Sequence, residues 1–101
     1  MNKTIAEVTV VPLGTASTSL SQYVADVENV LKRYPNLKTE LTPMSTIIEG
    51  EIDQILKAVR EMHETPFLNG AQRVSTRLSL DDRRDKISSM KSKVDSVKSK
   101  Q

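Results

Sequence analysis

Apolar and polar residues alternate along four short stretches of the chain, and this period of two predicts four strands. The predicted strands lie at residues 4–13, 37–42, 46–49 and 73–80. Three of them combine an apolar face with a mixed or polar face, as half-buried strands do. The third is a continuous β-branched and apolar run, which we expect Gly50 to end. The dipeptide Asn69-Gly70 is typical of a turn and precedes the fourth strand.

Apolar residues at three- and four-residue spacing predict three helices. The predicted helices lie at residues 19–34, 51–64 and 86–101. Ser19, with Gln22 three residues later, has the form of a capping box, and Pro35-Asn36 closes the first helix. The apolar stripe of the third helix consists of Ile87, Met90, Val94 and Val97. Because so narrow a stripe does not stabilise an isolated helix, we expect this helix to dock on its own core or on a neighbouring chain.

Two prolines mark boundaries in the pattern. Pro43 cannot donate to a strand ladder, so the second and third strands are predicted to be joined by a turn at residues 42–45. Pro66 is expected to end or kink the second helix. Phe67 and Leu68 are then expected to cover the end of the core.

The order of these elements is β-α-β-β-α-β followed by a helix, which is the ferredoxin-like pattern of an α+β protein. Right-handed crossovers give an antiparallel sheet with strand order 4-1-3-2 and two helices on one face. A chain of 101 residues is the size of one domain, so residues 1–101 are predicted to form a single domain.

The second face of this sheet has no predicted element to cover it. Its residues would be Ile5, Glu7, Thr9, Val11, Lys38, Glu40, Thr42, Arg73, Ser75 and Arg77. A face that mixes apolar groups with charges of both signs is typical of one that meets a partner subunit or a ligand. We therefore expect at least a dimer.

Composition narrows the partners and the compartment. The chain has 15 Lys and Arg against 13 Asp and Glu, a net charge of +2, so no overall field attracts nucleic acid or a membrane surface. Cysteine is absent, which fits a reducing compartment, and no apolar run approaches the roughly 20 residues of a membrane span. These features predict a soluble, cytoplasmic protein.

Nucleic acid is disfavoured for a second reason. RNA-binding modules of this topology stack bases on aromatic residues of the central strands. Here the aromatic residues are Tyr23, Tyr34 and Phe67, and none lies on a predicted central strand. The lysine-rich segment from residue 86 to 101 is interpreted as a solvated helix face, with a polyanion site as the weaker alternative.

The sequence also limits the chemistry. His63 is the only histidine, so paired-histidine metal sites are excluded, and on its helix it is interpreted as a partly exposed structural residue. The polar residues predicted near strand ends are Glu7, Thr15, Thr42, Thr46, Glu49 and Arg77. Glu49 follows two isoleucines, where a carboxylate is desolvated unless it is paired. The alternative for Glu49 is a structural role, either paired with an arginine of the fourth strand or capping the second helix.

Three segments resemble successive motifs of the small, single-domain thiamine-binding proteins. They are Val11-Pro12-Leu13-Gly14-Thr15, then Glu40-Leu41-Thr42-Pro43-Met44 with Thr46, Ile48, Glu49 and Gly50, and finally Asp81-Asp82-Arg83-Arg84-Asp85-Lys86. One departure is Ser45, where the family is expected to have glycine. The resemblance implies a ferredoxin-like, non-catalytic binder of thiamine or its hydroxymethylpyrimidine moiety that assembles as a dimer of dimers.

The resemblance also suggests roles for the candidate residues. Thr15, Thr42 and Thr46 suit the planar donors and acceptors of an aminopyrimidine, and Glu49 suits its amino group or the thiazolium cation. Arg77 completes the expected ligand-binding set. No cofactor or metal is expected, and no residue pair suited to cleaving or transferring thiamine is present. The alternative function is a structural or regulatory oligomer that binds another protein through the open sheet face, and an enzyme is the third choice.

Overall fold

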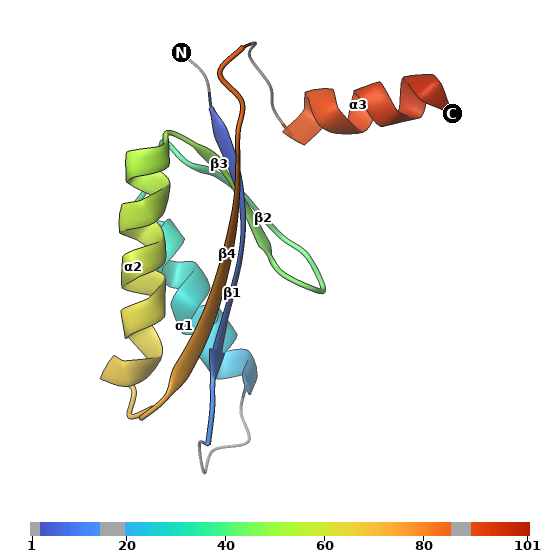
Figure 1. The fold of residues 1–101 in the computed structure, drawn as a ribbon. Coiled ribbons are helices and arrows are strands. Elements are labelled where there is room, and N and C mark those ends of the chain that lie inside the picture. The colour runs from blue at the N-terminus through green and yellow to red at the C-terminus, as the bar shows by residue number, and fades with distance from the viewer. Residues whose placement is uncertain (1–2, 15–19, 86–89) are drawn as a thin grey trace.

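The structure is a computed structural model that describes residues 3–14, 20–85 and 90–101 (Figure 1). Its elements are β1 (Thr4–Pro12), α1 (Leu20–Leu31), β2 (Lys38–Leu41), β3 (Thr46–Gly50), α2 (Ile52–Leu68), β4 (Val74–Asp82) and α3 (Met90–Lys100). The strands form one antiparallel sheet in the order β2-β3-β1-β4. This confirms the predicted α+β class and the predicted strand order 4-1-3-2.

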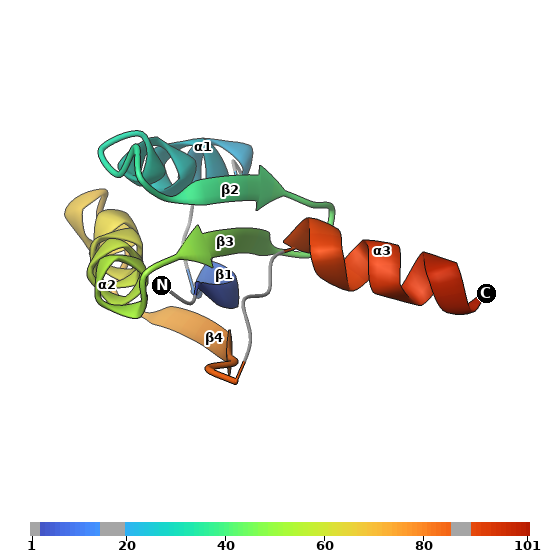
Figure 2. The same ribbon diagram turned by 90° about the horizontal axis from the view of Figure 1, so that it is seen from above.

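The two long helices lie on the same side of the sheet, and α3 lies on the other side (Figure 2). The core between the sheet and α1 and α2 is apolar, because the alternating face of each strand meets the helix stripes. Ala6 and Val8 of β1 are 1% exposed, and Ile48 of β3 and Ile55 of α2 are 0% exposed. Burying an aliphatic side chain of this size contributes roughly 1.5–3 kcal/mol.

The register of β1 with its two neighbours fixes which residues share a face. Val8 lies opposite Thr46 of β3 and Leu78 of β4, and these residues face the helices. Ile5 lies opposite Glu49 and Asp81 on the other face. The predicted division of β1 into an apolar face and a mixed face is therefore confirmed.

The turn between β2 and β3 occupies the position predicted from Pro43. The backbone N–H of Thr42 donates to the carbonyl of Ser45 at 2.8 Å. The Thr42 hydroxyl accepts the Ser45 N–H at 3.0 Å and donates to the Ser45 carbonyl at 2.8 Å. The side chain of Thr42 thus stabilises the turn that Pro43 predicts.

The end of α2 differs from the prediction. The helix does not stop before Pro66 but continues through it to Leu68. Pro66 has no N–H to donate to the carbonyl four residues earlier, but it lies in the last turn, so few helical residues follow it, and its ring is fully buried. Leu68 is 83% exposed and Phe67 is 37% exposed, so neither covers the core as expected. Phe67 instead meets the ring of His63 edge-on, with centroids 5.5 Å apart.

The third helix extends away from the sheet in both views (Figures 1 and 2). Val94 and Val97 of α3 are 51% and 57% exposed, so α3 does not dock on the chain's own core. Among the described residues, Lys93 of α3 forms an ion pair with Asp81 of β4. The expected contribution of Ile87 lies outside the described residues, as does the predicted capping residue Ser19.

Candidate functional site

A cleft of about 230 Å³ opens beside the turn between β2 and β3. Its walls come from β1, from α1 and from the turn itself. Its apolar lining consists of Val8, Val10, Val11, Val24, Val27, Leu41, Pro43, Met44 and Met62. Clefts that hold drug-sized ligands measure roughly 300–1,000 Å³, so this one suits a smaller group such as a single substituted ring.

The cleft exists because β1 extends beyond the end of its pairing with β3. β4 pairs with β1 up to Pro12, whereas β3 pairs with it only up to Val8. Along an antiparallel pair of strands, every second residue exchanges hydrogen bonds with the neighbouring strand. The N–H of Leu13 donates to the carbonyl of Arg73 beside β4, so the residues at odd-numbered positions of β1 bond to β4. The N–H and C=O of Val10 therefore point away from β4, into the cleft. The strand edge therefore presents one donor and one acceptor there.

A carboxylate and a hydroxyl meet across the cleft. Val24, Val27 and Glu28 are three and four residues apart, so α1 presents all of them on one side. Thr46 begins β3 and is 6% exposed. Its hydroxyl donates to Oε2 of Glu28 at 3.0 Å. This hydrogen bond orients a half-buried carboxylate at the polar end of an otherwise apolar cleft.

Ser45 stands where glycine is expected in the family, and it holds the rim of the cleft. Its hydroxyl donates to Oε2 of Glu7 at 2.8 Å, which ties the turn to β1. Ser45 has no positive φ, so its backbone does not need glycine here. Met44, at the tip of the turn, is 83% exposed.

The structure separates the predicted ligand-binding residues into two groups. Thr42 and Thr46 both line the cleft, although the hydroxyl of Thr42 is engaged in the turn. Glu49 and Arg77 lie on the opposite, open face of the sheet. Thr15 lies outside the described residues. A single site for all five predicted residues is not seen in the described part of the chain.

Glu49 is buried as its position after two isoleucines predicts, with 2% of its surface exposed. It lies opposite Ile5 of β1 and Lys38 of β2. Within residues 3–14, 20–85 and 90–101, no side chain forms a hydrogen bond or an ion pair with its carboxylate, so the predicted arginine partner is not seen there. The residue that precedes α2 as its N-cap is Glu51, not Glu49, and its side chain makes no capping hydrogen bond.

Sequence reasoning missed Glu28. The pattern of the first helix does contain a signal, because an acidic residue directly follows Val27 inside the apolar stripe. That signal indicates a carboxylate at the edge of the core. It does not reveal that Thr46, 18 positions away, would hold it.

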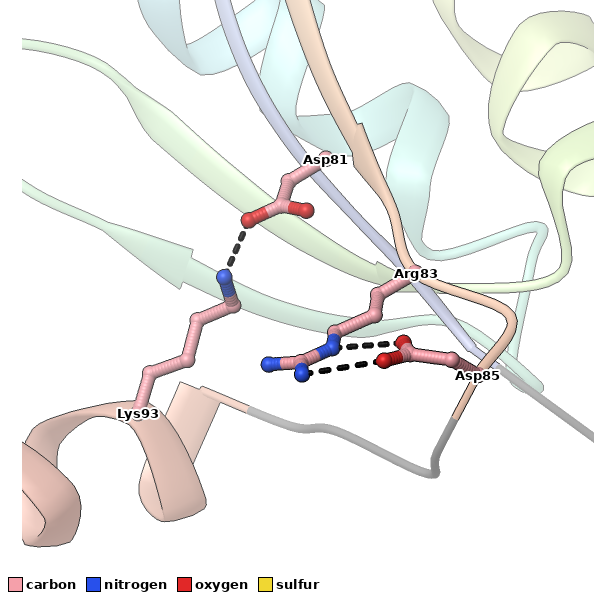
Figure 3. Close-up of polar contacts among 4 residues, drawn as sticks. All are labelled: Asp81, Arg83, Asp85 and Lys93. Carbon is pink, nitrogen blue, oxygen red and sulfur yellow. Dashed lines mark hydrogen bonds and ion pairs between the residues drawn. The ribbon is translucent and has the colours of Figure 1, made fainter.

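The acidic and basic residues at the end of β4 and just after it form a second cluster, part of which is drawn in Figure 3. Nε and a terminal nitrogen of Arg83 donate to the two oxygens of Asp85 at 2.6 and 3.1 Å. Arg84 donates to Asp82 at 2.8 Å, and this hydrogen bond holds the pKa of Asp82 below its usual value. The same partnerships raise the pKa of each arginine. Both guanidinium groups are thus paired with carboxylates of their own segment, and the contact from this cluster to α3 is the ion pair between Asp81 and Lys93.

Among the described residues, no three His, Cys, Asp or Glu side chains are grouped so that they could hold a metal ion. In the same part of the chain, none of the helices has the length and apolar character needed to cross a membrane.

Comparisons with known proteins agree with this architecture. The sequence profile of a family described as thiamine-binding protein matches residues 6–98. The chain is 46% identical over 96 residues to the UPF0045 protein YqgV of Bacillus subtilis, with 92% of both chains covered. It is also similar to the crystal structure of the hypothetical protein MJ1052 from Methanocaldococcus jannaschii, with a TM-score of 0.85, 40% identity, and 97% of this chain and 98% of that chain covered. A putative thiamine biosynthesis/salvage protein (TM0486) from Thermotoga maritima shares the fold, with a TM-score of 0.76, 22% identity, and 94% and 98% coverage.

The sheet order, the two helices on one face and the cleft beside the turn define a ferredoxin-like α+β domain. The chain belongs to the thiamine-binding protein family, since the family profile and the relatives span nearly all of it. The family resemblance of its three sequence motifs is thereby confirmed.

Proposed function

We propose that this protein binds thiamine or its hydroxymethylpyrimidine moiety and does not catalyse a reaction on it. The observation that carries the proposal is the match of residues 6–98 to the thiamine-binding protein family. The cleft supports it, because its size suits one ring and its walls are apolar.

The polar groups of the cleft match those of an aminopyrimidine. The ring nitrogens accept hydrogen bonds and the exocyclic amino group donates them, all in one plane. The free edge of β1 at Val10 offers a donor and an acceptor, and the carboxylate of Glu28 offers acceptors. A pyrimidine in the cleft would lie against Val24 and Val27 with its amino group toward Glu28. The thiazolium ring of thiamine would then remain at the mouth.

Calorimetric titration with thiamine, its phosphates and hydroxymethylpyrimidine tests the ligand class. We expect heat of binding and a higher melting temperature with at least one of them. A blocking variant, Val24→Phe, should abolish binding, because Val24 lines the cleft and is 44% exposed. Leu56→Phe is the matched control, since Leu56 lies on α2 outside the cleft and is 42% exposed. No heat and no thermal shift at millimolar ligand would contradict the proposal.

The proposal includes self-association, as a dimer at least and as a dimer of dimers by family resemblance. The exposed valines of α3 support it, because a helix with so little apolar surface needs a partner to be stable. The open face supports it as well. Val11 is 43% exposed there, near Glu7 and Arg77, and a symmetric interface pairs such charges across a two-fold axis.

The proposed location is the cytoplasm, because a chain without cysteine fits a reducing compartment. Fractionation of cells that express the tagged protein tests this point. The alternative function, a structural or regulatory oligomer that binds another protein through the open face, remains the reading if every thiamine-related ligand fails to bind.

A further inference from the structure

The charge of the cleft is one-sided. Of the described residues that line it, Glu28 alone carries a charge, and that charge is negative. Residues 15–19, the segment of the sequence before α1, contain no lysine, arginine or histidine. A site that binds phosphate usually presents cations or several converging N–H groups. The described part of this cleft has no cation and a carboxylate instead.

The carboxylate of Glu28 is also fixed in direction. Thr46 donates to Oε2, and no other described side chain donates to Glu28, so Oε1 and the remaining lone pairs stay available to a ligand. Thr46 is 6% exposed at the start of a core strand, so its hydroxyl has little freedom to move. The pair is therefore a preformed acceptor for an amino group.

We propose that Glu28 sets the specificity of the cleft, so that it takes the unphosphorylated aminopyrimidine and rejects its phosphate ester. This inference rests on the proposed function. In hydroxymethylpyrimidine the amino and hydroxymethyl groups are on adjacent ring carbons. An amino group that donates to Glu28 therefore brings the esterified oxygen close to the same carboxylate, where a phosphate is repelled.

The test is calorimetric titration of the full chain with hydroxymethylpyrimidine and with hydroxymethylpyrimidine phosphate. We expect the unphosphorylated compound to bind at least tenfold more tightly. Glu28→Gln keeps the shape of the side chain and an acceptor for Thr46 but removes the charge. It should weaken binding of hydroxymethylpyrimidine, leave or improve binding of the phosphate, and so reduce the ratio at least fivefold.

Asp26→Asn is the matched control, because it removes one negative charge from the same helix. Asp26 bonds with Gln22 and Asn69 and does not line the cleft, so the ratio should not change. Equal affinity of the wild-type chain for both compounds, or an unchanged ratio in Glu28→Gln, overturns this inference and leaves the proposed function standing. If neither hydroxymethylpyrimidine nor thiamine binds the wild-type chain, the proposed function fails and this inference fails with it.

Discussion

Replacing Gly50 by alanine should destabilise the fold, for a reason that only the packing shows. Gly50 is the last residue of β3, is buried, and lies opposite Thr4 of β1. A methyl group added at Gly50 would come closer than 3.0 Å to a side-chain methyl of Leu37. Carbon atoms prefer about 3.5–4.0 Å, so Leu37 must withdraw by at least about 0.5 Å. Leu37 is 8% exposed and has little space into which to move.

Overpacking of this kind costs about 1–3 kcal/mol, whereas alanine in a strand gains roughly 0.5–1 kcal/mol over glycine. The net expectation for Gly50→Ala is a loss of up to about 2.5 kcal/mol in the free energy of unfolding. Urea denaturation at fixed protein concentration measures it, and the melting temperature should fall by about 4–8 °C per kcal/mol.

A double-mutant cycle with Leu37→Ala isolates the clash. That variant alone should cost about 2–5 kcal/mol, because it removes a buried side chain. Once Leu37 is truncated, adding Gly50→Ala should cost nothing, since the methyl group it met is gone. An equal effect of Gly50→Ala on stability in both backgrounds would refute the reasoning.

Three other predictions follow from the same structure. Thr46→Val removes the hydroxyl that donates to Glu28 without changing the shape of the side chain, so the affinity for thiamine should fall about fivefold, roughly 1 kcal/mol. Thr39→Val, on exposed β2, should leave the affinity unchanged, and an equal loss of affinity in both variants would argue against the cleft. Burial raises the pKa of Tyr34, and the neighbouring Glu61 raises it further, so the free energy of unfolding of the wild type should fall as the pH rises above about 10. Tyr34→Phe should lose less stability over the same range. Equal losses in the two proteins, measured by urea denaturation below and above about pH 10, would count against this. The full chain should scatter light as a dimer or larger and become smaller when residues 86–101 are deleted, whereas a full chain of one chain mass would contradict self-association.

The fold was predictable because the hydrophobic pattern of each strand and helix can be recognised within a few residues. The period of two in β1 and the three- and four-residue spacing in α1 are local properties of the sequence, and the strand register then brings the apolar faces of neighbouring strands together. The end of the second helix was placed too early for the same reason. A proline is expected to break a helix because it lacks an N–H. Here the ring of Pro66 is buried in the last turn of α2, and burial is a tertiary property that the local sequence does not show.

The candidate site was predictable only in part. Thr42 and Thr46 flank a turn that Pro43 makes visible in the sequence, so their proximity could be inferred. The meeting of Glu28 with Thr46 depends on how α1 lies across the sheet, and no local pattern encodes that. Gly50 was expected to end the third strand, and it is the last residue of β3. The sequence did not reveal that the absence of a side chain there makes room for Leu37.

The two faces of the sheet give the two proposals separate structural bases. β1 extends past Val8 without β3, and this unpaired edge opens the cleft beside α1. The buried carboxylate of Glu49 lies on the other face, next to Ile5 and Lys38, where a partner chain would dock. A carboxylate left buried without a described partner is costly. The proposed ligand site and the proposed interface therefore share β1 and meet at Val11, but Glu28 belongs to the cleft and Glu49 to the open face, so each proposal can be tested by a substitution of its own.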